Sequence, residues 1–233
     1  MVLFKKTSDL LVFFKYLCYY IFGDYMKILF GTRNKNKAIE AKAIFATIAP
    51  FVQLVSLDEI DPKRTIEEPI EDGDSFYANS LIKAKYYFEK TNIPTLCDDS
   101  GIVVDALDGA PGIYSARFSI GSNYKAETVD KANNLKLLDL MKNETNKNAH
   151  YACEMVFYDG ERIISGYGEL QGEILDREVG SGGFGYDPLF FIPEYKKTLG
   201  EIDAMTKNKI SHRYKAILNV ATKINNEICH KTK

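Results

Sequence analysis

The chain has 233 residues, enough for one large domain or two small ones with a buried core. Hydrophobic residues make up 45% of the sequence and charged residues 27%, which is the usual composition of a soluble globular protein. The net charge of −2 excludes the global basic field that a nucleic-acid partner calls for, so phosphate groups must be bound by a local cluster of lysines and arginines.

The first 25 residues differ from the rest of the chain. An apolar run over residues 10–22 is too short to span a bilayer, and no small-x-small cleavage site follows it. Met26 then precedes the strand-like residues 27–30. We therefore interpret residues 1–25 as an extension outside the fold and residues 26–230 as one domain. A membrane-surface helix is the alternative for the extension.

The first half of the domain alternates strands and helices. Apolar runs predict strands over residues 28–30 and 51–57, and apolar residues at helical spacing predict helices over residues 36–47 and 75–91. Ser75 is a suitable cap for the second helix. The segment between the second strand and the second helix is polar and contains two prolines, so we expect a connection without regular structure.

The sequence of the second half of the domain predicts two short strands, a helix, a hairpin and a closing helix. The hairpin has alternating or apolar strands around a turn at Asp159-Gly160. Helices and strands in this order favour an α/β fold with a mixed sheet. In chain order, these elements are expected over residues 95–97, 102–106, 126–142, 151–158, 162–174 and 211–228.

The cysteines of the chain indicate neither a metal site nor a disulfide. Cys18, Cys97, Cys153 and Cys229 are widely separated and form no CxxC pair. Scattered single cysteines are typical of a reducing compartment, so we expect a cytoplasmic protein in which Cys97 and Cys153 are small buried hydrophobes.

The first polar patch, Thr32-Arg33-Asn34-Lys35-Asn36-Lys37, joins the first strand to the first helix. A loop that enters a helix N-terminus offers free backbone N–H groups and the positive end of the helix dipole. Thr32 and Asn34 add side-chain donors and Lys37 adds a point charge, which suits a triphosphate. The loop lacks the GxxxxGK[ST] spacing of a Walker loop, and a solvated basic turn is the alternative.

The second patch combines Glu71 with the adjacent acids Asp98 and Asp99. Neighbouring carboxylates repel each other unless a cation or solvent offsets the repulsion. Oxygen-rich carboxylate clusters select hard cations, so we expect Mg²⁺ here. Adjacent strand residues point to opposite faces, so at most one aspartate is expected to face the site. An ordinary Asp-Ser-Gly turn is the alternative.

The third patch is the glycine-rich segment over residues 180–188. Its glycines let the backbone approach a ligand closely, and Phe184 and Tyr186 could stack on a planar base. A flexible hairpin tip is the alternative. Phe184 between glycines would pack poorly without a ligand, which favours binding.

The fourth patch is Lys207 with Ser211-His212-Arg213 at the start of the closing helix. By themselves these residues could cap the helix and add surface charge. The three histidines, His150, His212 and His230, lie in unrelated contexts, so no Ser/His/Asp nucleophile set is indicated.

Taken together, the patches resemble the Ham1 family of inosine/xanthosine triphosphate pyrophosphatases, from Met26 almost to the end of the chain. The resemblance rests on an ordered set of motifs. They are Glu71-Asp72-Gly73, Phe76, Asn79 through Lys83-Ala84, Asp98-Asp99-Ser100-Gly101, Gly109-Ala110-Pro111-Gly112-Ile113-Tyr114-Ser115-Ala116-Arg117, Gly183-Phe184-Gly185-Tyr186-Asp187-Pro188 and Ser211-His212-Arg213.

The resemblance implies an elongated mixed sheet with flanking helices that form two lobes around a nucleotide-binding cleft, and it implies a homodimer. It implies Mg²⁺-dependent hydrolysis of inosine, deoxyinosine and xanthosine triphosphates to monophosphate and pyrophosphate. By the same resemblance, Glu71 and Asp99 serve the metal, and Asp99 is also the general base. The implied phosphate and nucleotide contacts are Thr32, Arg33, Asn34, Lys35, Asn36, Lys37, Ser100, Phe184, Gly185, Tyr186, Asp187, Lys207, His212 and Arg213.

Two positions depart from the family's pattern. Arg33 stands where many members have glycine, so the first loop would hold phosphate with an extra cation. Ala78 replaces a glutamate that is common before Asn79. Lys83 and Arg117 are further candidates for phosphate contacts or for supporting the site.

Three other functions compete with this one. A related pyrophosphatase for modified pyrimidine triphosphates would differ in base preference alone. A dinucleotide-dependent oxidoreductase is disfavoured because the first strand-loop-helix lacks GxGxxG. An inactive nucleotide-binding module should lack the acids, which are present. Donors from His212 and Arg213 at O6 would favour keto purines over adenine.

Overall fold

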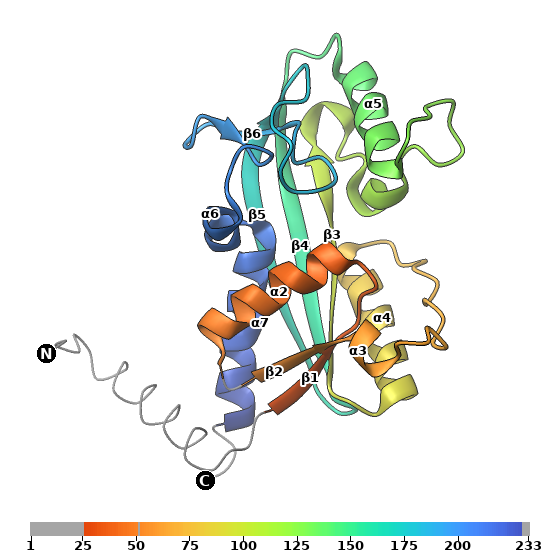
Figure 1. Cartoon of the computed structure of the whole chain (residues 1–233), viewed down its shortest axis with the longest axis vertical. Helices are drawn as coiled ribbons and strands as arrows, with labels where there is room; N and C mark the ends of the chain where they lie inside the picture. Colours follow the sequence, from red (N-terminus) through yellow and green to blue (C-terminus); the bar gives the residue numbers. More distant parts are fainter. Residues whose placement is uncertain (1–25, 51, 230–233) are drawn as a thin grey trace, which may run out of the picture.

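The structure is a computed structural model that describes residues 26–50 and 52–229 (Figure 1). The interpretation of residues 1–25, as an extension or as a membrane-surface helix, falls outside the described residues. Within the described ranges, no helix is both long enough and apolar enough to cross a membrane.

The fold contains one mixed sheet with helices packed around it (Figure 1). The strands are β1 (Met26–Phe30), β2 (Val52–Ser56), β3 (Thr95–Val104), β4 (Asn148–Tyr158), β5 (Ile163–Ile174), β6 (Phe190–Ile192) and β7 (Lys197–Thr198). The α-helices are α2 (Lys35–Ile48), α3 (Leu57–Ile60), α4 (Phe76–Thr91), α5 (Val129–Met141), α6 (Ala204–Ile210) and α7 (His212–Cys229). Two 3₁₀ helices, η1 (Asp105–Leu107) and η2 (Gly112–Arg117), follow β3.

The sheet has seven strands in the order β2-β1-β3-β4-β5-β6-β7. β1 is parallel to β2 and to β3, and every later pairing is antiparallel, which confirms the predicted mixed α/β sheet. The long strands β3, β4 and β5 run along most of the molecule. Helices α2, α3, α4 and α7 lie toward one end of these strands, and α5 lies at the other end (Figure 1).

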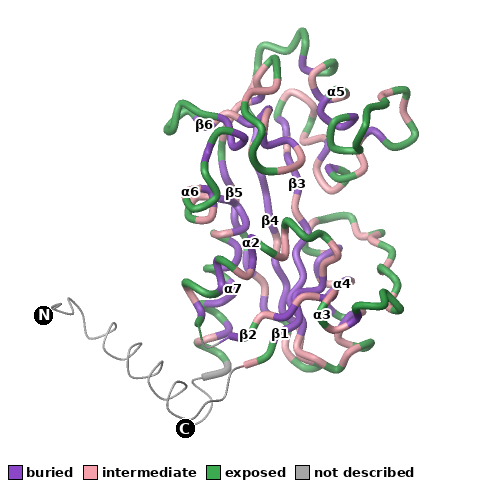
Figure 2. The backbone as a smooth tube through the Cα atoms, in the orientation of Figure 1, coloured by how far each residue is buried: buried purple, intermediate pink, exposed green. Residues whose placement is uncertain are grey.

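Side chains of β3 alternate between two buried layers. Leu96 belongs to the apolar cluster under α2 and α7, whereas Cys97 belongs to the cluster under α4. Buried residues therefore follow the central strands along their length (Figure 2). Cys97 and Cys153 are buried free thiols, as predicted, and burial raises the pKa of both.

The predicted interruption between residues 95–97 and 102–106 is wrong, because β3 is one continuous strand. Its antiparallel ladder with β4 runs through the acidic segment, pairing Asp99 with Glu154 and Gly101 with Ala152. Cations on both faces of the sheet compensate the two aspartates, so the backbone need not leave the ladder there.

Local sequence signals account for most helix boundaries. Ser75 caps α4 by accepting the Ala78 N–H at 3.2 Å, as predicted. The expected irregular connection after β2 instead begins with the short helix α3. Glu59 accepts the Ser56 N–H at 2.6 Å there, which is the reciprocal half of a capping box. The sequence analysis also missed β6, β7 and α6, which are all short.

Candidate active site

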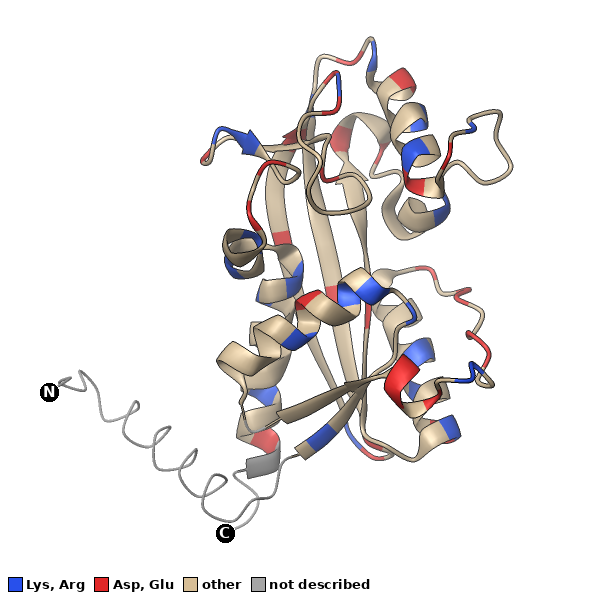
Figure 3. Cartoon of the chain, viewed as in Figure 1, with Lys and Arg blue, Asp and Glu red and all other residues tan. Residues whose placement is uncertain are grey.

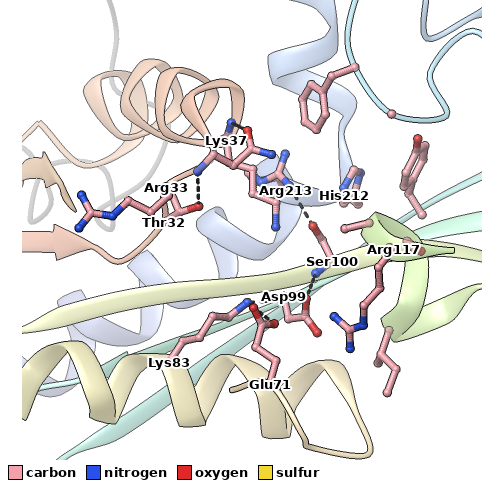
Figure 4. A pocket seen from close by; sticks show the side chains of 18 of the residues that line it. Thr32, Arg33, Lys37, Glu71, Lys83, Asp99, Ser100, Arg117, His212 and Arg213 are labelled. Atoms are coloured by element: carbon pink, nitrogen blue, oxygen red, sulfur yellow. Dashed lines mark hydrogen bonds and ion pairs between the residues drawn. The ribbon is translucent and has the colours of Figure 1, made fainter. Parts of the chain in front are cut away.

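One pocket of about 450 Å³ brings the four polar patches together (Figure 4). Charged residues lie mainly on helices and loops, while the central strands are largely uncharged (Figure 3). Lys35 and Asn36 are the predicted site residues that the pocket lining does not include. The predicted residues that line it are Thr32, Arg33, Asn34, Lys37, Glu71, Asp99, Ser100, Phe184, Gly185, Tyr186, Asp187, Lys207, His212 and Arg213.

The loop between β1 and α2 forms one wall of the pocket. Asn34 is the N-cap of α2, and its Oδ1 accepts the N–H groups of Asn36 at 3.0 Å and Lys37 at 3.2 Å. These two amides are therefore not free for a ligand, contrary to the expectation for this loop. Lys37 lies one turn into the helix, and its Nζ is 3.1 Å from Asp98 Oδ2. The ammonium of Lys37 is therefore a positive charge that this loop and helix bring to the pocket.

Arg33 also lines the pocket, and its guanidinium is held by acids that follow β2. It forms ion pairs with Asp58 at 2.8 Å and Asp61 at 2.5 Å and donates to the Ile66 carbonyl oxygen at 3.1 Å. In Figure 4 the side chain points away from Lys83 and Asp99. Two carboxylates compensate the guanidinium although Arg33 lines the pocket, so its role as an extra phosphate-binding cation stays a prediction.

The adjacent aspartates of β3 face opposite sides of the sheet, as predicted. Asp98 is buried under α2 and α7, where Lys37 and Arg213 contact it. Burial alone would raise the pKa of Asp98, but Lys37 and Arg213 outweigh it and hold the pKa below its usual value. Asp99 lies on the α4 side and lines the pocket, whereas Asp98 does not. Asp98 is therefore a permanent anion behind the site.

Asp99 has the electrostatic environment of a proton acceptor. Burial raises its pKa, and Lys83, Lys37 and the Asn79 hydrogen bond offset that effect only in part. Asn79 Nδ2 donates to Asp99 Oδ2 at 3.1 Å, and the Ser100 N–H donates to Oδ1 at 3.0 Å. These donors fix the carboxylate plane at the pocket wall.

Lys83 links the two carboxylates that the sequence analysis assigned to a metal. Its Nζ is 2.8 Å from Glu71 Oε2 and 3.7 Å from Asp99 Oδ1. Burial by itself would lower the pKa of Lys83. The negative charges of Asp99 and Glu71 outweigh burial and raise the pKa above its usual value, so the ammonium stays charged. Asn79 also accepts the Gly73 N–H at 2.9 Å, which ties the Glu71 segment to α4.

The donor set at Glu71 and Asp99 fits Mg²⁺. The described ranges hold no group of three His, Cys, Asp or Glu side chains suited to a metal. Mg²⁺ does not require such a group, because it is usually bound by one or two carboxylates, waters and substrate phosphates. The two carboxylates line the same pocket and both contact Lys83, so they are close enough to hold one cation with a substrate phosphate.

A buried ion network lies behind the Asp98 face of β3. Arg213 is 1% exposed; its Nη1 donates to Glu40, and its Nε and Nη2 donate to Asp98 at 3.2 and 3.1 Å. The Ser211 hydroxyl donates to Glu40 at 2.9 Å, and Arg213 Nη2 donates to Ser100 Oγ at 3.0 Å. Carboxylates and the Ser100 hydroxyl accept four hydrogen bonds from Arg213, while its guanidinium lines the pocket 5.9 Å from the Phe184 ring centroid, so a donor from Arg213 to the base O6 stays a prediction.

The glycine-rich loop forms the opposite end of the pocket. The Phe184 N–H donates to Asp187 Oδ2 at 2.8 Å, and Lys207 Nζ lies 2.5 Å from the same oxygen. A Cβ on Gly183 would lie 2.0 Å from that oxygen, so only glycine fits. Lys207 Nζ is 4.6 Å from the Phe184 ring centroid. Phe184 and a paired lysine thus face the pocket together.

Tyr186 and His212 support this end from behind. Tyr186 is 4% exposed, packs in an apolar cluster and donates its hydroxyl to the Ser115 carbonyl oxygen at 2.8 Å. Phe184 is therefore the aromatic of the loop that is free to stack. His212 stacks on Tyr151, with centroids 4.7 Å apart. Burial, then the charges of Arg213 and Lys207, lower the pKa of His212, so the imidazole is neutral.

Glu40 was not identified from the sequence, Asn79 was named only as part of the family motif, and Lys83 only as a further candidate. All three are polar residues on the buried faces of α2 and α4. Their signal is a polar side chain at an apolar position of a helical pattern, such as Lys83 beside buried Ala84 and Tyr87.

A sequence model of the Ham1 family matches residues 28–223 of the chain. A protein of Geobacter sulfurreducens named dITP/XTP pyrophosphatase is 42% identical over 194 residues, covering 82% of this chain and 92% of the relative. The Aquifex aeolicus protein of the same name is 38% identical over 196 residues, covering 82% of this chain and 93% of that protein.

Solved structures agree with the sequence matches. The Staphylococcus aureus Ham1 protein superposes with a TM-score of 0.72 at 33% identity, covering 86% of this chain and 99% of that one. A HAM1 protein from Coxiella burnetii gives a TM-score of 0.74 at 26% identity, with the same coverage of 86% and 99%.

Proposed function

Because this chain belongs to the Ham1 family, we propose that it hydrolyses non-canonical purine nucleoside triphosphates, namely those of inosine, deoxyinosine and xanthosine, to the monophosphate and pyrophosphate. The relatives named dITP/XTP pyrophosphatase support this substrate class. The observation that carries the proposal is one pocket whose lining combines Lys37, Lys83 and Asp99 with the Phe184 ring.

We assign Asp99 as the general base. It accepts a proton from the attacking water while the water oxygen forms its bond to the α-phosphorus. The bond from that phosphorus to the bridging oxygen breaks, and pyrophosphate leaves. The raised pKa of Asp99 supports this role, because a base acts best when its pKa lies nearer the working pH. Lys37 and Lys83 provide positive charge for the phosphate oxygens.

We propose that Glu71 and Asp99 hold Mg²⁺ together with the substrate phosphates. The bound cation would neutralise phosphate charge. Lys83 contacts both carboxylates, so its ammonium compensates their charge when no metal ion is bound.

At the other end, Phe184 stacks on the base and the neutral His212 contributes selectivity. Purines with a keto group at C6 present an acceptor at O6, whereas adenine presents an amino donor there. A ring N–H of His212 therefore suits the keto purines. The buried Nδ1 of His212, which has no partner in the described part of the chain, supports a polar role toward the ligand.

We further propose a homodimer that works in the cytoplasm. The Ham1 resemblance supports the dimer, and the buried free thiols Cys97 and Cys153 are consistent with a reducing compartment. Size-exclusion chromatography with light scattering tests the dimer.

A substrate panel tests the function. Pyrophosphate and phosphate release are measured from the triphosphates of inosine, deoxyinosine, xanthosine, adenosine and guanosine and from a modified pyrimidine triphosphate, with and without MgCl₂. We expect pyrophosphate release, dependent on Mg²⁺ and fastest with the first three. Preferred hydrolysis of the pyrimidine, or release of phosphate alone, would contradict the proposal.

A further inference from the structure

Helix α5 holds the backbone of the glycine-rich loop at Gly185, the residue that follows Phe184. Asp130 Oδ2 accepts the Gly185 N–H at 2.9 Å, and Asn134 Nδ2 donates to the Gly185 carbonyl oxygen at 3.2 Å. Both backbone polar groups of one residue are thus bound by side chains one helical turn apart on α5. These are i and i+4 positions, which lie on the same helix face.

All the side-chain hydrogen bonds that orient Asn134 in the described ranges are donated by its amide nitrogen, Nδ2. The side chain is 2% exposed, and Nδ2 also donates to Glu178 Oε1 at 2.7 Å. Its Oδ1 is buried without a hydrogen-bond partner in the described ranges. An unsatisfied buried oxygen is unfavourable, so this residue is not explained by helix stability. Its two acceptors, both outside α5, explain its orientation.

The loop needs such support because glycines flank Phe184. Gly183 and Gly185 have φ of +75° and +62°, in the left-handed region that glycine enters without strain. Asp187 fixes the N-terminal side of Phe184 by accepting its N–H at 2.8 Å. The peptide on the C-terminal side is held by Asp130 and Asn134. Without them, the Phe184 ring would have more freedom before a ligand arrives.

We propose that Asp130 and Asn134 are positioning residues that preorganise Phe184 for the base, so that α5 sets the affinity for the base half of the nucleotide. This inference rests on the proposed function. Preorganised loops bind more tightly because less conformational entropy is lost on binding. The effect is expected at Phe184 alone, because neither residue lines the pocket and both act through Gly185.

The test separates base binding from phosphate binding. Asp130→Ala removes the acceptor for Gly185, and Asn134→Leu removes the donor while keeping a similar shape. For each variant we measure kcat and KM with inosine triphosphate, the Kd of inosine monophosphate by calorimetry, and the Ki of inorganic tripolyphosphate, which has no base. Asp130→Asn is the conservative control, because its amide oxygen still accepts a hydrogen bond.

Thr128→Ala is the matched control for helix fraying. Thr128 caps α5 by accepting the Lys131 N–H at 3.2 Å and contacts neither Gly185 nor the pocket. Loss of this cap loosens the first turn of α5, which carries Asp130, but keeps the Asp130 carboxylate and the Asn134 amide that bind Gly185.

We expect Asp130→Ala and Asn134→Leu each to raise KM and the monophosphate Kd roughly three- to tenfold, the net contribution of one hydrogen bond. The kcat and the tripolyphosphate Ki should stay within about twofold, and Asp130→Asn and Thr128→Ala should resemble wild type. Asp130 is exposed, so its variant is expected to fold even if Asn134→Leu does not.

Three results would overturn the proposal: an unchanged KM in Asp130→Ala, a parallel rise of KM and tripolyphosphate Ki, or equal effects of Thr128→Ala and Asp130→Ala. Wild-type protein that does not hydrolyse inosine triphosphate would instead contradict the proposed function itself.

Discussion

The two ends of the pocket are built on different physical principles. At the end proposed for the phosphates, buried charges compensate one another on both faces of β3, as in the pairs Lys37–Asp98 and Lys83–Asp99. At the base end, a glycine-rich loop is held mainly by hydrogen bonds to its backbone. Removing one buried charge leaves its partner uncompensated, whereas removing one hydrogen bond is a local loss. Substitutions at the phosphate end should therefore be far more damaging.

The largest effect is expected for Asp99→Asn. The change keeps the shape but removes the proton acceptor, and loss of general-base catalysis alone is worth about 10²- to 10⁴-fold in rate. Turnover of inosine triphosphate should nearly vanish while the circular dichroism spectrum stays that of wild type. Retention of more than half the activity would exclude Asp99 as the base.

Arg213→Met tests the buried network by stability rather than by rate. The methionine leaves Asp98 and Glu40 as buried carboxylates without their shared guanidinium. Breaking a buried ion pair in this way costs about 3–5 kcal/mol. Chemical denaturation should show that loss. A variant with wild-type stability and altered base preference would show that Arg213 contacts the base rather than stabilising the fold.

Phe184→Ala should have an intermediate effect confined to binding. Stacking of a base on an aromatic side chain is worth about 1–3 kcal/mol by alanine substitution. KM should rise for inosine, adenosine and guanosine triphosphates by a similar factor, because every base has an aromatic face. A rise for only one of the three would show that Phe184 selects bases rather than stacking on all of them.

Arg33→Gly should have the smallest effect on turnover, although it removes a charge from the loop before α2. The guanidinium pairs with Asp58 and Asp61, and the Arg33 and Asp61 side chains are only 9% and 7% exposed, so the loss should lower the free energy of unfolding rather than the rate. Steady-state kinetics should show a change in KM below about fivefold with kcat unchanged. A loss larger than that of Phe184→Ala would mean that Arg33 binds phosphate after all.

Features set by neighbours in the chain could be predicted from the sequence. The Ser75 cap depends on an N–H three residues away, and the β4–β5 hairpin depends on alternation around Asp159-Gly160. The opposite orientation of Asp98 and Asp99 follows from the two-residue period of any strand. The site motifs were recognisable because their order along the chain resembles that of a family. The pocket lining includes all but two of the predicted residues.

Which charges pair, and which side chains face a ligand, was decided only by the tertiary structure. Arg33 and Arg213 look like free cations in the sequence, yet their partners are Asp58, Asp61, Asp98 and Glu40, the last of which is 173 positions from Arg213. β3 continues through its two acids because Lys37, Arg213 and Lys83 reach it from three different helices. A charged side chain takes the partner that the fold brings within a few ångströms, and local sequence carries no information about that distance.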